Sequence, residues 1–253
     1  MPFPDARAHG VAVTPSGERV FVSMNEGKGI VVLDAEKEEC LPPVHGLVNY
    51  YPGDGTLDDA HGVGALGGGT MAFAPGLQGQ AFRFNGKSSY LSARAGSSYC
   101  PFCTYSWTEA FFVKFDAPDE EMTILETASM PPGPGRRVFR AHDRHVVLES
   151  NGGRDARLTI RSAEALVNAR WYHLAVVTDR DQRSFYIDGR LQGKHTIQPS
   201  TDDGAIGPLY IGATQGKRNF LSGLMDELVV YNRVLTQGEI RTMSERSHGA
   251  CMQ

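Results

Sequence analysis

The sequence has no long hydrophobic run and no excess of basic residues. None of its apolar stretches approaches the ~18 residues that a membrane-spanning helix needs, so we expect no membrane span. Lys and Arg number 25 against 29 Asp and Glu, which gives a formal net charge of −4. Binding to nucleic-acid phosphates needs clustered Lys and Arg, so this balance argues against a nucleic-acid partner. The sequence is that of a soluble globular protein.

Cysteine is also scarce, and the four cysteines are too few for a disulfide scaffold. Cys100 and Cys103 form a CxxC, but a strand is predicted after it where a redox site has a helix. No second CxxC completes a zinc site, so a local disulfide or two free thiols are expected. Cys40 and Cys251 flank the second domain and could pair if its ends meet. The first residues lack the charged and apolar regions of a secretory leader.

Glycine and proline, by contrast, are abundant, at 29 and 14 residues. They divide the chain into many short segments, which favours β structure over helices. Residues 11–13, 19–23 and 30–34 are β-branched runs between turn-forming clusters, and this pattern predicts a three-stranded meander.

The string AHGVAVTPSGERVFV at residues 8–22 resembles one blade repeat of the YVTN/NHL β-propellers, over about residues 7–35. A propeller needs ~4–8 blades, and the sequence shows no second copy. A charged run and a double proline then indicate a linker before residue 44. We therefore divide the chain into a propeller-blade-like meander with its linker (1–43), a second domain (44–246) and a C-terminal tail (247–253). The exposed edges of a single blade predict self-association through the meander.

The second domain reads as a series of short strands and one helix. We predict strands at 81–84, 90–92, 108–115, 122–127, 138–141, 145–149, 157–161, 171–178, 184–187, 190–192, 209–213 and 224–231. Asn85-Gly86 predicts a hairpin, and Asp188-Gly189 predicts a type I′ hairpin turn. A capping box from Thr236 to Glu239 predicts a helix that runs to Glu245. The fold class is therefore all-β, a two-sheet antiparallel sandwich.

Three strings in this domain match a known family. The first is GLQGQAFRFNG at 76–86, and the second is RWYHLAVV at 170–177 with FYIDG at 185–189. The third is LYIG at 209–212 with FLSGLMDEL at 220–228 and YNR at 231–233. In order and spacing they resemble the LamG-like jelly-roll domains of the concanavalin A-like lectin/glucanase fold. The resemblance implies a jelly-roll sandwich over residues 44–246.

Because this fold includes glucanases, a pair of carboxylates in the sequence would indicate a glycosidase. Glycosidases act with two carboxyl groups ~5–9.5 Å apart, and in glucanases of this fold they lie on one strand, as in Glu-x-Asp-x-x-Glu. The sequence has no such string, and Glu126 and Glu149 stand alone in their predicted strands. We expect no catalytic residues and a protein that is not an enzyme.

Calcium is the cofactor that the sequence favours. The string DGTLDDAHG at 54–62 supplies the oxygen ligands that hard cations bind. In LamG-like relatives an Asp at about the position of Asp59, and the Asp equivalent to Asp226, help to bind a structural calcium. The resemblance implies the same here, with Asp58 as an alternative in register. The competing interpretation is a solvated turn for Asp59 and a carboxylate that caps backbone amides for Asp226.

The fold match and the absent carboxylate pair together favour a lectin-like module that binds a glycan or a glycosylated protein. Its ligand residues are unknown: Tyr50, Tyr51, Tyr99, Tyr105 and Trp107 could stack on sugars or equally belong to the core. The alternatives are a structural or protein-interaction module without sugar binding and, third, a glycoside hydrolase. The resemblance suggests an extracellular or cell-envelope protein within a larger architecture.

Overall fold

A computed structural model describes residues 8–13, 19–24, 30–34, 45–61, 65–93, 106–129, 137–151, 157–197 and 206–245. It confirms the predicted all-β class with one helix. The strands are β1 (Ala8–Val13), β2 (Arg19–Met24), β3 (Ile30–Asp34), β4 (Leu47–Tyr51), β5 (Gly67–Gly68), β6 (Ala72–Pro75), β7 (Gln80–Asn85), β8 (Leu91–Ala93), β9 (Ser106–Phe115), β10 (Met122–Ser129), β11 (Arg137–His142), β12 (His145–Asn151), β13 (Arg157–Arg161), β14 (Trp171–Asp179), β15 (Gln182–Ile187), β16 (Arg190–Thr196), β17 (Ile206–Ile211) and β18 (Ser222–Tyr231); the helix is α1 (Gln237–Glu245).

The first three strands form an antiparallel sheet of their own. Their order is β1-β2-β3, with Val11 opposite Val22 and Val22 opposite Val31. The backbone therefore confirms the predicted meander. Its identity as a propeller blade, its role in self-association and the domain boundary near residue 44 stay predictions. All four cysteines lie outside the described residues.

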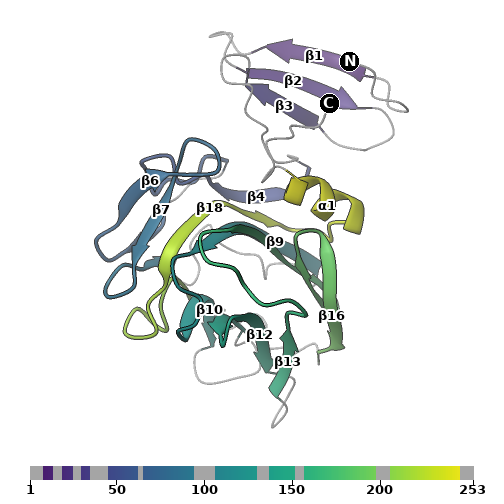
Figure 1. Cartoon of the computed structure of the whole chain (residues 1–253). Helices are drawn as coiled ribbons and strands as arrows, with labels where there is room; N and C mark the ends of the chain where they lie inside the picture. Colours follow the sequence, from purple (N-terminus) through teal and green to yellow (C-terminus); the bar gives the residue numbers. More distant parts are fainter. Residues whose placement is uncertain are drawn as a thin grey trace.

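The other strands form two antiparallel sheets that face one another as a sandwich (Figure 1). One sheet has seven strands in the order β13-β12-β11-β10-β17-β8-β5. The other has eight: the path β16-β15-β14-β9-β18-β7-β6, with β4 paired to β18. The strand predicted at 108–115 is β9, a long apolar strand that lies in the middle of its sheet.

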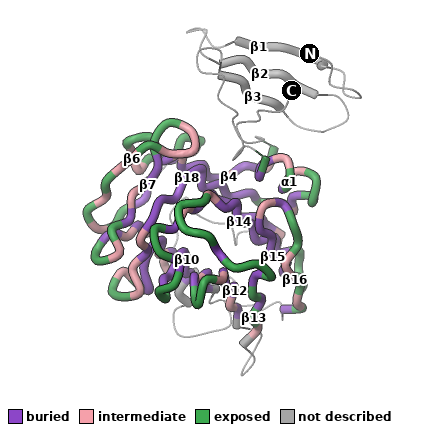
Figure 2. Tube along the Cα trace, in the orientation of Figure 1, coloured by how far each residue is buried: buried purple, intermediate pink, exposed green. Residues whose placement is uncertain are grey.

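The main core fills the space between the two sheets, where the buried trace is concentrated (Figure 2). Alternate residues of β9, such as Phe111 and Phe115, point into it because side chains alternate along a strand. The rings of Phe111 and Phe139 meet edge-on at 5.9 Å, and Phe139 and Phe185 lie 5.6 Å apart. Burying each such ring contributes about 1.5–3 kcal/mol, so these contacts hold the sheets together.

A second apolar cluster lies on the opposite face of the eight-stranded sheet, beneath α1. Ala110 and Val177 of the sheet pack there with Ile240 and Met243 of the helix. The helix begins with the predicted capping box: the Glu239 carboxylate accepts from the Thr236 amide at 2.7 Å, and the Thr236 hydroxyl accepts from the Glu239 amide at 3.2 Å. The sequence prediction of this helix is confirmed.

The hairpin predicted at Asn85-Gly86 is wrong. The two strands that it joins belong to different sheets, β7 to the eight-stranded one and β8 to the seven-stranded one. The Asn85 side chain instead accepts hydrogen bonds from the amides of Lys87, Ser88 and Ser89. This local cap turns the chain from one sheet to the other, and such Asx geometry competes with a tight hairpin turn.

Gly212 offers a test of this packing. Its φ is +79°, and an added Cβ would lie 2.3 Å from the Phe84 ring. We expect Gly212→Ala to lower the free energy of unfolding by about 2 kcal/mol or more, because strain and overpacking add. Gly238→Ala in α1 is the control: its Cβ meets nothing closer than 3.8 Å. Chemical denaturation should show that this variant is neutral or slightly more stable, and equal losses in both would contradict the argument.

Candidate functional site

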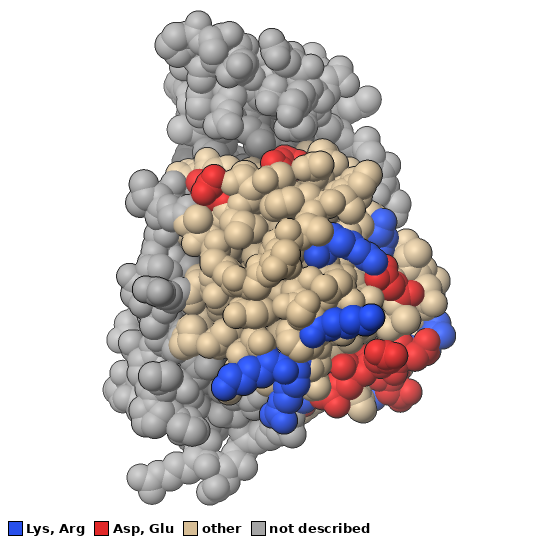
Figure 3. All heavy atoms as spheres, turned by 90° about the vertical axis from the view of Figure 1, so that its left-hand side faces the viewer, with Lys and Arg blue, Asp and Glu red and all other residues tan. Residues whose placement is uncertain are grey.

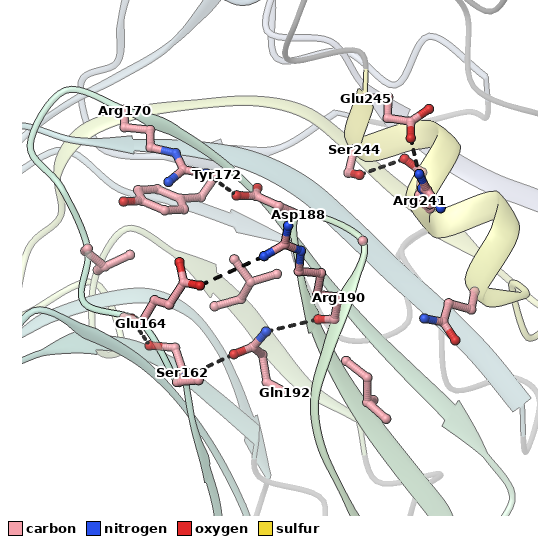
Figure 4. Close-up of a pocket in the computed structure, with 16 residues that line it drawn as sticks. Ser162, Glu164, Arg170, Tyr172, Asp188, Arg190, Gln192, Arg241, Ser244 and Glu245 are labelled. Atoms are coloured by element: carbon pink, nitrogen blue, oxygen red, sulfur yellow. Dashed lines mark hydrogen bonds and ion pairs between the residues drawn. The ribbon is translucent and has the colours of Figure 1, made fainter.

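A pocket of about 910 Å³ opens at one end of the eight-stranded sheet (Figure 4). Three segments far apart in the sequence surround it. They are the loop from Ser162 to Arg170 before β14, the tip of the β15–β16 hairpin, and one side of α1. Because all of its lining residues are described, this pocket can be analysed side chain by side chain.

The hairpin tip is fixed by its turn residues. Asp188 and Gly189 both have positive φ, +48° and +72°, as the predicted type I′ turn requires. A Cβ at Gly189 would lie 2.8 Å from the Arg241 Cα. Position 189 therefore requires glycine for two reasons: the positive φ of the turn, and the close contact between the hairpin tip and α1.

Asp188 also anchors the next wall of the pocket. Its Oδ1 accepts from the His173 amide at 2.9 Å, and its Oδ2 pairs with the Arg170 guanidinium at 2.7 Å. That guanidinium stacks on the Tyr172 ring, 4.7 Å from the centroid. The Tyr172 hydroxyl accepts from the Val167 amide at 2.6 Å. These contacts tie the loop to β14 and preorganise this side of the pocket.

Two further ion pairs complete the rim. Arg190 lies 3.9 Å from Glu164, both about 82% exposed, and Arg241 lies 3.0 Å from Glu245 within α1. Such exposed pairs contribute at most about 1 kcal/mol each. Gln192 accepts from the Ala163 amide at 3.0 Å and donates to the Arg190 carbonyl at 3.1 Å. The rim thus carries three guanidinium groups and three carboxylates.

The pocket also offers apolar surface. Leu191, which lines it, is 42% exposed, and Val167 in the neighbouring loop is 52% exposed. Among the described residues these are the large hydrophobic side chains that remain exposed. The aromatic residues considered from the sequence lie elsewhere: Tyr50, Tyr51 and Trp107 are buried in the cores. Tyr99 and Tyr105 lie outside the described residues.

The predicted metal ligand Asp59 lies buried beside β4. Its Oδ1 accepts from the Tyr50 amide at 2.9 Å and the His61 amide at 3.0 Å, and its Oδ2 accepts from the Asn49 side chain at 2.6 Å. Burial and the nearby Asp59 charge raise the pKa of Tyr51. Asp58, in contrast, is exposed. Its side chain and its amide bond to the Thr56 hydroxyl, and Asp58 forms an isolated β-bridge with Ala65.

Asp226 lies at a β-bulge, where β18 gains one residue relative to β9 between Asp226 and Val229. Its Oδ2 accepts from the amides of Leu77 (2.7 Å) and Gln78 (3.3 Å), and its Oδ1 accepts from the Glu227 amide (3.0 Å). These are the amide-capping contacts of the competing interpretation.

Burial, and then the adjacent Glu227 carboxylate, raise the pKa of Asp226 to about 8, against the effect of its three amide bonds. Glu227 has a φ of +54° and accepts from the Tyr50 hydroxyl at 2.8 Å. Asp59 and Glu227 are therefore both bonded to Tyr50, which brings two of the buried carboxylates to one residue.

These carboxylates do not by themselves make a calcium site. Ca²⁺ takes 6–8 oxygen ligands, whereas the oxygens of Asp59 and Asp226 are oriented toward N–H donors. In the described part of the chain, no three His, Cys, Asp or Glu side chains form a group suited to a metal. Calcium binding by Asp58, Asp59 and Asp226 therefore stays a prediction.

Two carboxylates that stand alone in the sequence come together in the fold. Glu126 and Glu149 both lie directly opposite Val138, on β10 and β12, the two strands that flank β11. Directly paired residues share a face, so the two Glu residues face the same side, about 9.5 Å apart at their Cα atoms. Glu126 is fully buried, and the Glu149 carboxylate lies 3.9 Å from Arg140.

The family follows from this fold and from the sequence together. Residues 85–241 match the Laminin_G_3 family, described as the concanavalin A-like lectin/glucanases superfamily. The chain belongs to this superfamily. The match covers more than half of the chain and agrees with the jelly-roll fold predicted from the sequence and seen here. No curated protein matches the chain.

Solved structures show the same fold at low identity. Domain 4 of a GH43 extracellular arabinanase from Geobacillus stearothermophilus, in complex with arabinotriose, has a TM-score of 0.65 and 23% identity over 78% of this chain and 98% of its own. The binding domain of Paraclostridial Mosquitocidal Protein 1 has a TM-score of 0.62 and 14% identity, over 79% of this chain and 52% of its own.

The binding domain of botulinum neurotoxin DC, in complex with SialylT, has a TM-score of 0.61 and 12% identity, over 80% of this chain and 52% of its own. This chain thus spans about half of each toxin domain. At these identities the likeness shows the fold alone. The described part of the chain has no helix long and apolar enough to cross a membrane.

Sequence reasoning missed the pocket. Arg170, Asp188 and Gly189 stand inside the strings that predict the jelly-roll fold, and these strings give no sign of a pocket. The contributions of Glu164 and Arg241 have no local signal. The one usable signal is the Asp-Gly turn followed by Arg190, which predicts a charged hairpin tip.

Asp226→Asn should flatten the dependence of stability on pH. The pKa of Asp226 is about 8 in the folded protein and about 3.9 in an unfolded chain. Its contribution to stability is therefore fully present below about pH 4 and is lost as the pH rises through about 8. In EDTA, the free energy of unfolding of the wild type should fall between about pH 5 and about pH 8 by roughly 1 kcal/mol or more relative to the variant.

Parallel pH profiles for the two proteins would contradict this prediction. Repeating the measurement in calcium tests the predicted metal site. A cation bound by Asp226 stabilises the ionised carboxylate, so calcium would remove the fall in stability, and Asp59→Asn would abolish this calcium effect. Denaturation curves that are identical in EDTA and calcium would contradict the predicted site.

Proposed function

We propose that this protein is a non-catalytic module that binds glycans, alone or on glycoproteins, through the pocket between the β15–β16 hairpin and α1. The observation that carries the proposal is the make-up of this pocket. Planar guanidinium, carboxylate and amide groups surround an open cavity that also exposes Leu191. Sites of this kind bind small ligands through a few placed polar groups over an apolar surface.

Sugar chemistry fits such a rim. Each hydroxyl group both donates and accepts, and vicinal hydroxyls match groups with two donors or two acceptors. The N–H donors of Arg190 and Arg241 and the carboxylate oxygens of Glu164 and Glu245 supply both kinds. The arabinanase domain that shares this fold carries arabinotriose in its structure, which supports a sugar as the ligand class. An extracellular location remains part of the proposal.

Arg190→Ala and Arg241→Ala should each weaken glycan binding about ten-fold, because a hydrogen bond to a charged group contributes about 1.5 kcal/mol. Both side chains are largely exposed, so the fold should tolerate these changes. Arg161→Ala is the control, since Arg161 is an exposed arginine outside the pocket whose partner is Asp143 at 3.1 Å. A glycan array followed by calorimetry measures the effect. Binding unchanged in both pocket variants would place the glycan elsewhere.

The register of Glu126 and Glu149 favours a glycoside hydrolase as the second candidate. The two residues share one face of the sheet, and an inverting glycosidase acts with a pair of carboxyl groups. A protein-interaction module without sugar binding is the other alternative, and it would be supported by a folded protein that leaves every glycan on the array unbound but retains a protein partner.

We expect no turnover of glycan ligands, because Glu126 is fully buried and Glu149 is occupied by Arg140. The measurement is the release of new reducing ends from oligosaccharides that the protein binds. Glu126→Gln and Glu149→Gln serve as matched variants that keep side-chain size. Release that disappears in both variants would contradict this expectation and establish hydrolysis.

A further inference from the structure

Glycans fall into uncharged and acidic classes. Arabinotriose, which the structure of the arabinanase domain contains, is uncharged, whereas a sialylated glycan carries a carboxylate. The fold alone does not indicate which of these classes the pocket binds. The arrangement of charges around the pocket bears on this choice.

The charges of the pocket cancel pair by pair. Its lining includes three arginines and three acidic residues, and each guanidinium has a carboxylate beside it. The distances are 2.7 Å for Arg170–Asp188, 3.9 Å for Arg190–Glu164 and 3.0 Å for Arg241–Glu245. Elsewhere on the surface basic and acidic groups also adjoin one another, as the face in Figure 3 shows. In the pocket, three such pairs surround one cavity.

This pairing penalises an anionic ligand. A carboxylate that approaches one of these guanidinium groups also approaches the carboxylate that already neutralises it. At ~4 Å in water the attraction and the repulsion are each about 1 kcal/mol, so they offset one another. Breaking a pair to free the guanidinium leaves two carboxylates close together in the pocket. Anion recognition by arginine is strongest where the guanidinium charge is not already balanced, and here each guanidinium has a carboxylate beside it.

An uncharged sugar meets no such penalty. Hydroxyl groups donate to the carboxylates and accept from the guanidinium groups without separating the pairs. The apolar face of a sugar ring can also lie on Leu191, 42% exposed at the pocket wall.

We infer that the pocket selects uncharged oligosaccharides over acidic ones, and that Glu164 and Glu245 set this selectivity by neutralising Arg190 and Arg241. The inference rests on the proposed function, because it names the class of glycan that the same site takes.

The test is an array of uncharged and acidic oligosaccharides that includes arabinotriose and sialylated trisaccharides. The wild type should bind uncharged glycans about ten-fold or more tightly than acidic glycans of equal length, with little dependence on salt. The double variant Glu164→Gln with Glu245→Gln leaves two guanidinium groups without their carboxylates. It should gain about ten-fold or more in affinity for the acidic glycans, and this gain should weaken with salt.

Asp143→Asn is the matched control. It makes the same type of charge change at an exposed pair with Arg161, outside the pocket, and asparagine tolerates the positive φ of this position. A double variant that gains no more for acidic glycans than this control would overturn the inference. A wild type that prefers acidic glycans would overturn it too, while the proposed function stands. A folded wild type that binds no glycan would overturn both.

Discussion

The structure depends on an eight-stranded sheet that is apolar on both faces. Along β9, Phe111 and Phe115 pack into the sandwich core, while Ala110 packs on the opposite face. A sandwich needs cover on one face only, and a second apolar face left open to water would invite association. In this chain α1 provides the cover: its Ile240 and Met243 form one apolar cluster with Ala110 and Tyr50 of the sheet.

The pocket is a consequence of that cover. Because α1 must lie on the small residues Ala110 and Ala175, its later turns come to the end of the sheet where the β15–β16 hairpin closes. Gly189 permits the contact, since any side chain there would meet the Arg241 backbone. The ion pairs at the rim thus come from elements whose positions are set by packing and not by the pairs themselves, which at these exposures contribute little to stability.

The same division explains what the sequence could predict. The predicted strands, the capping box at Thr236 and the turn at Asp188-Gly189 are local features, and the structure confirms them. The strands β4, β5 and β6 were not predicted. The hairpin predicted at Asn85-Gly86 is wrong because an Asn-Gly pair is also found where the Asn side chain caps backbone amides, as Asn85 does with three of them. Glu126 and Glu149 seemed isolated because their proximity is created by register across β11. The pocket draws on three distant segments, so no window of sequence contains it.

The carboxylate of Asp226 and the carboxylates at the pocket rim lie in opposite environments. Asp226 is buried, and removal from water raises its pKa to about 8 even though three amides donate to it. Glu164 and Glu245 at the pocket rim are instead largely exposed. A buried carboxylate of this kind holds the Leu77 loop against β18 and has little freedom to engage a ligand.

The exposed groups at the rim can exchange water for the hydroxyl groups of a sugar at small cost. Because the exchange replaces one hydrogen bond by a similar one, each contact with the sugar is weak. Affinity at one such pocket is therefore modest, and a module of this kind gains strength when several are linked on one chain or one surface, because linkage raises the effective concentration of the second contact.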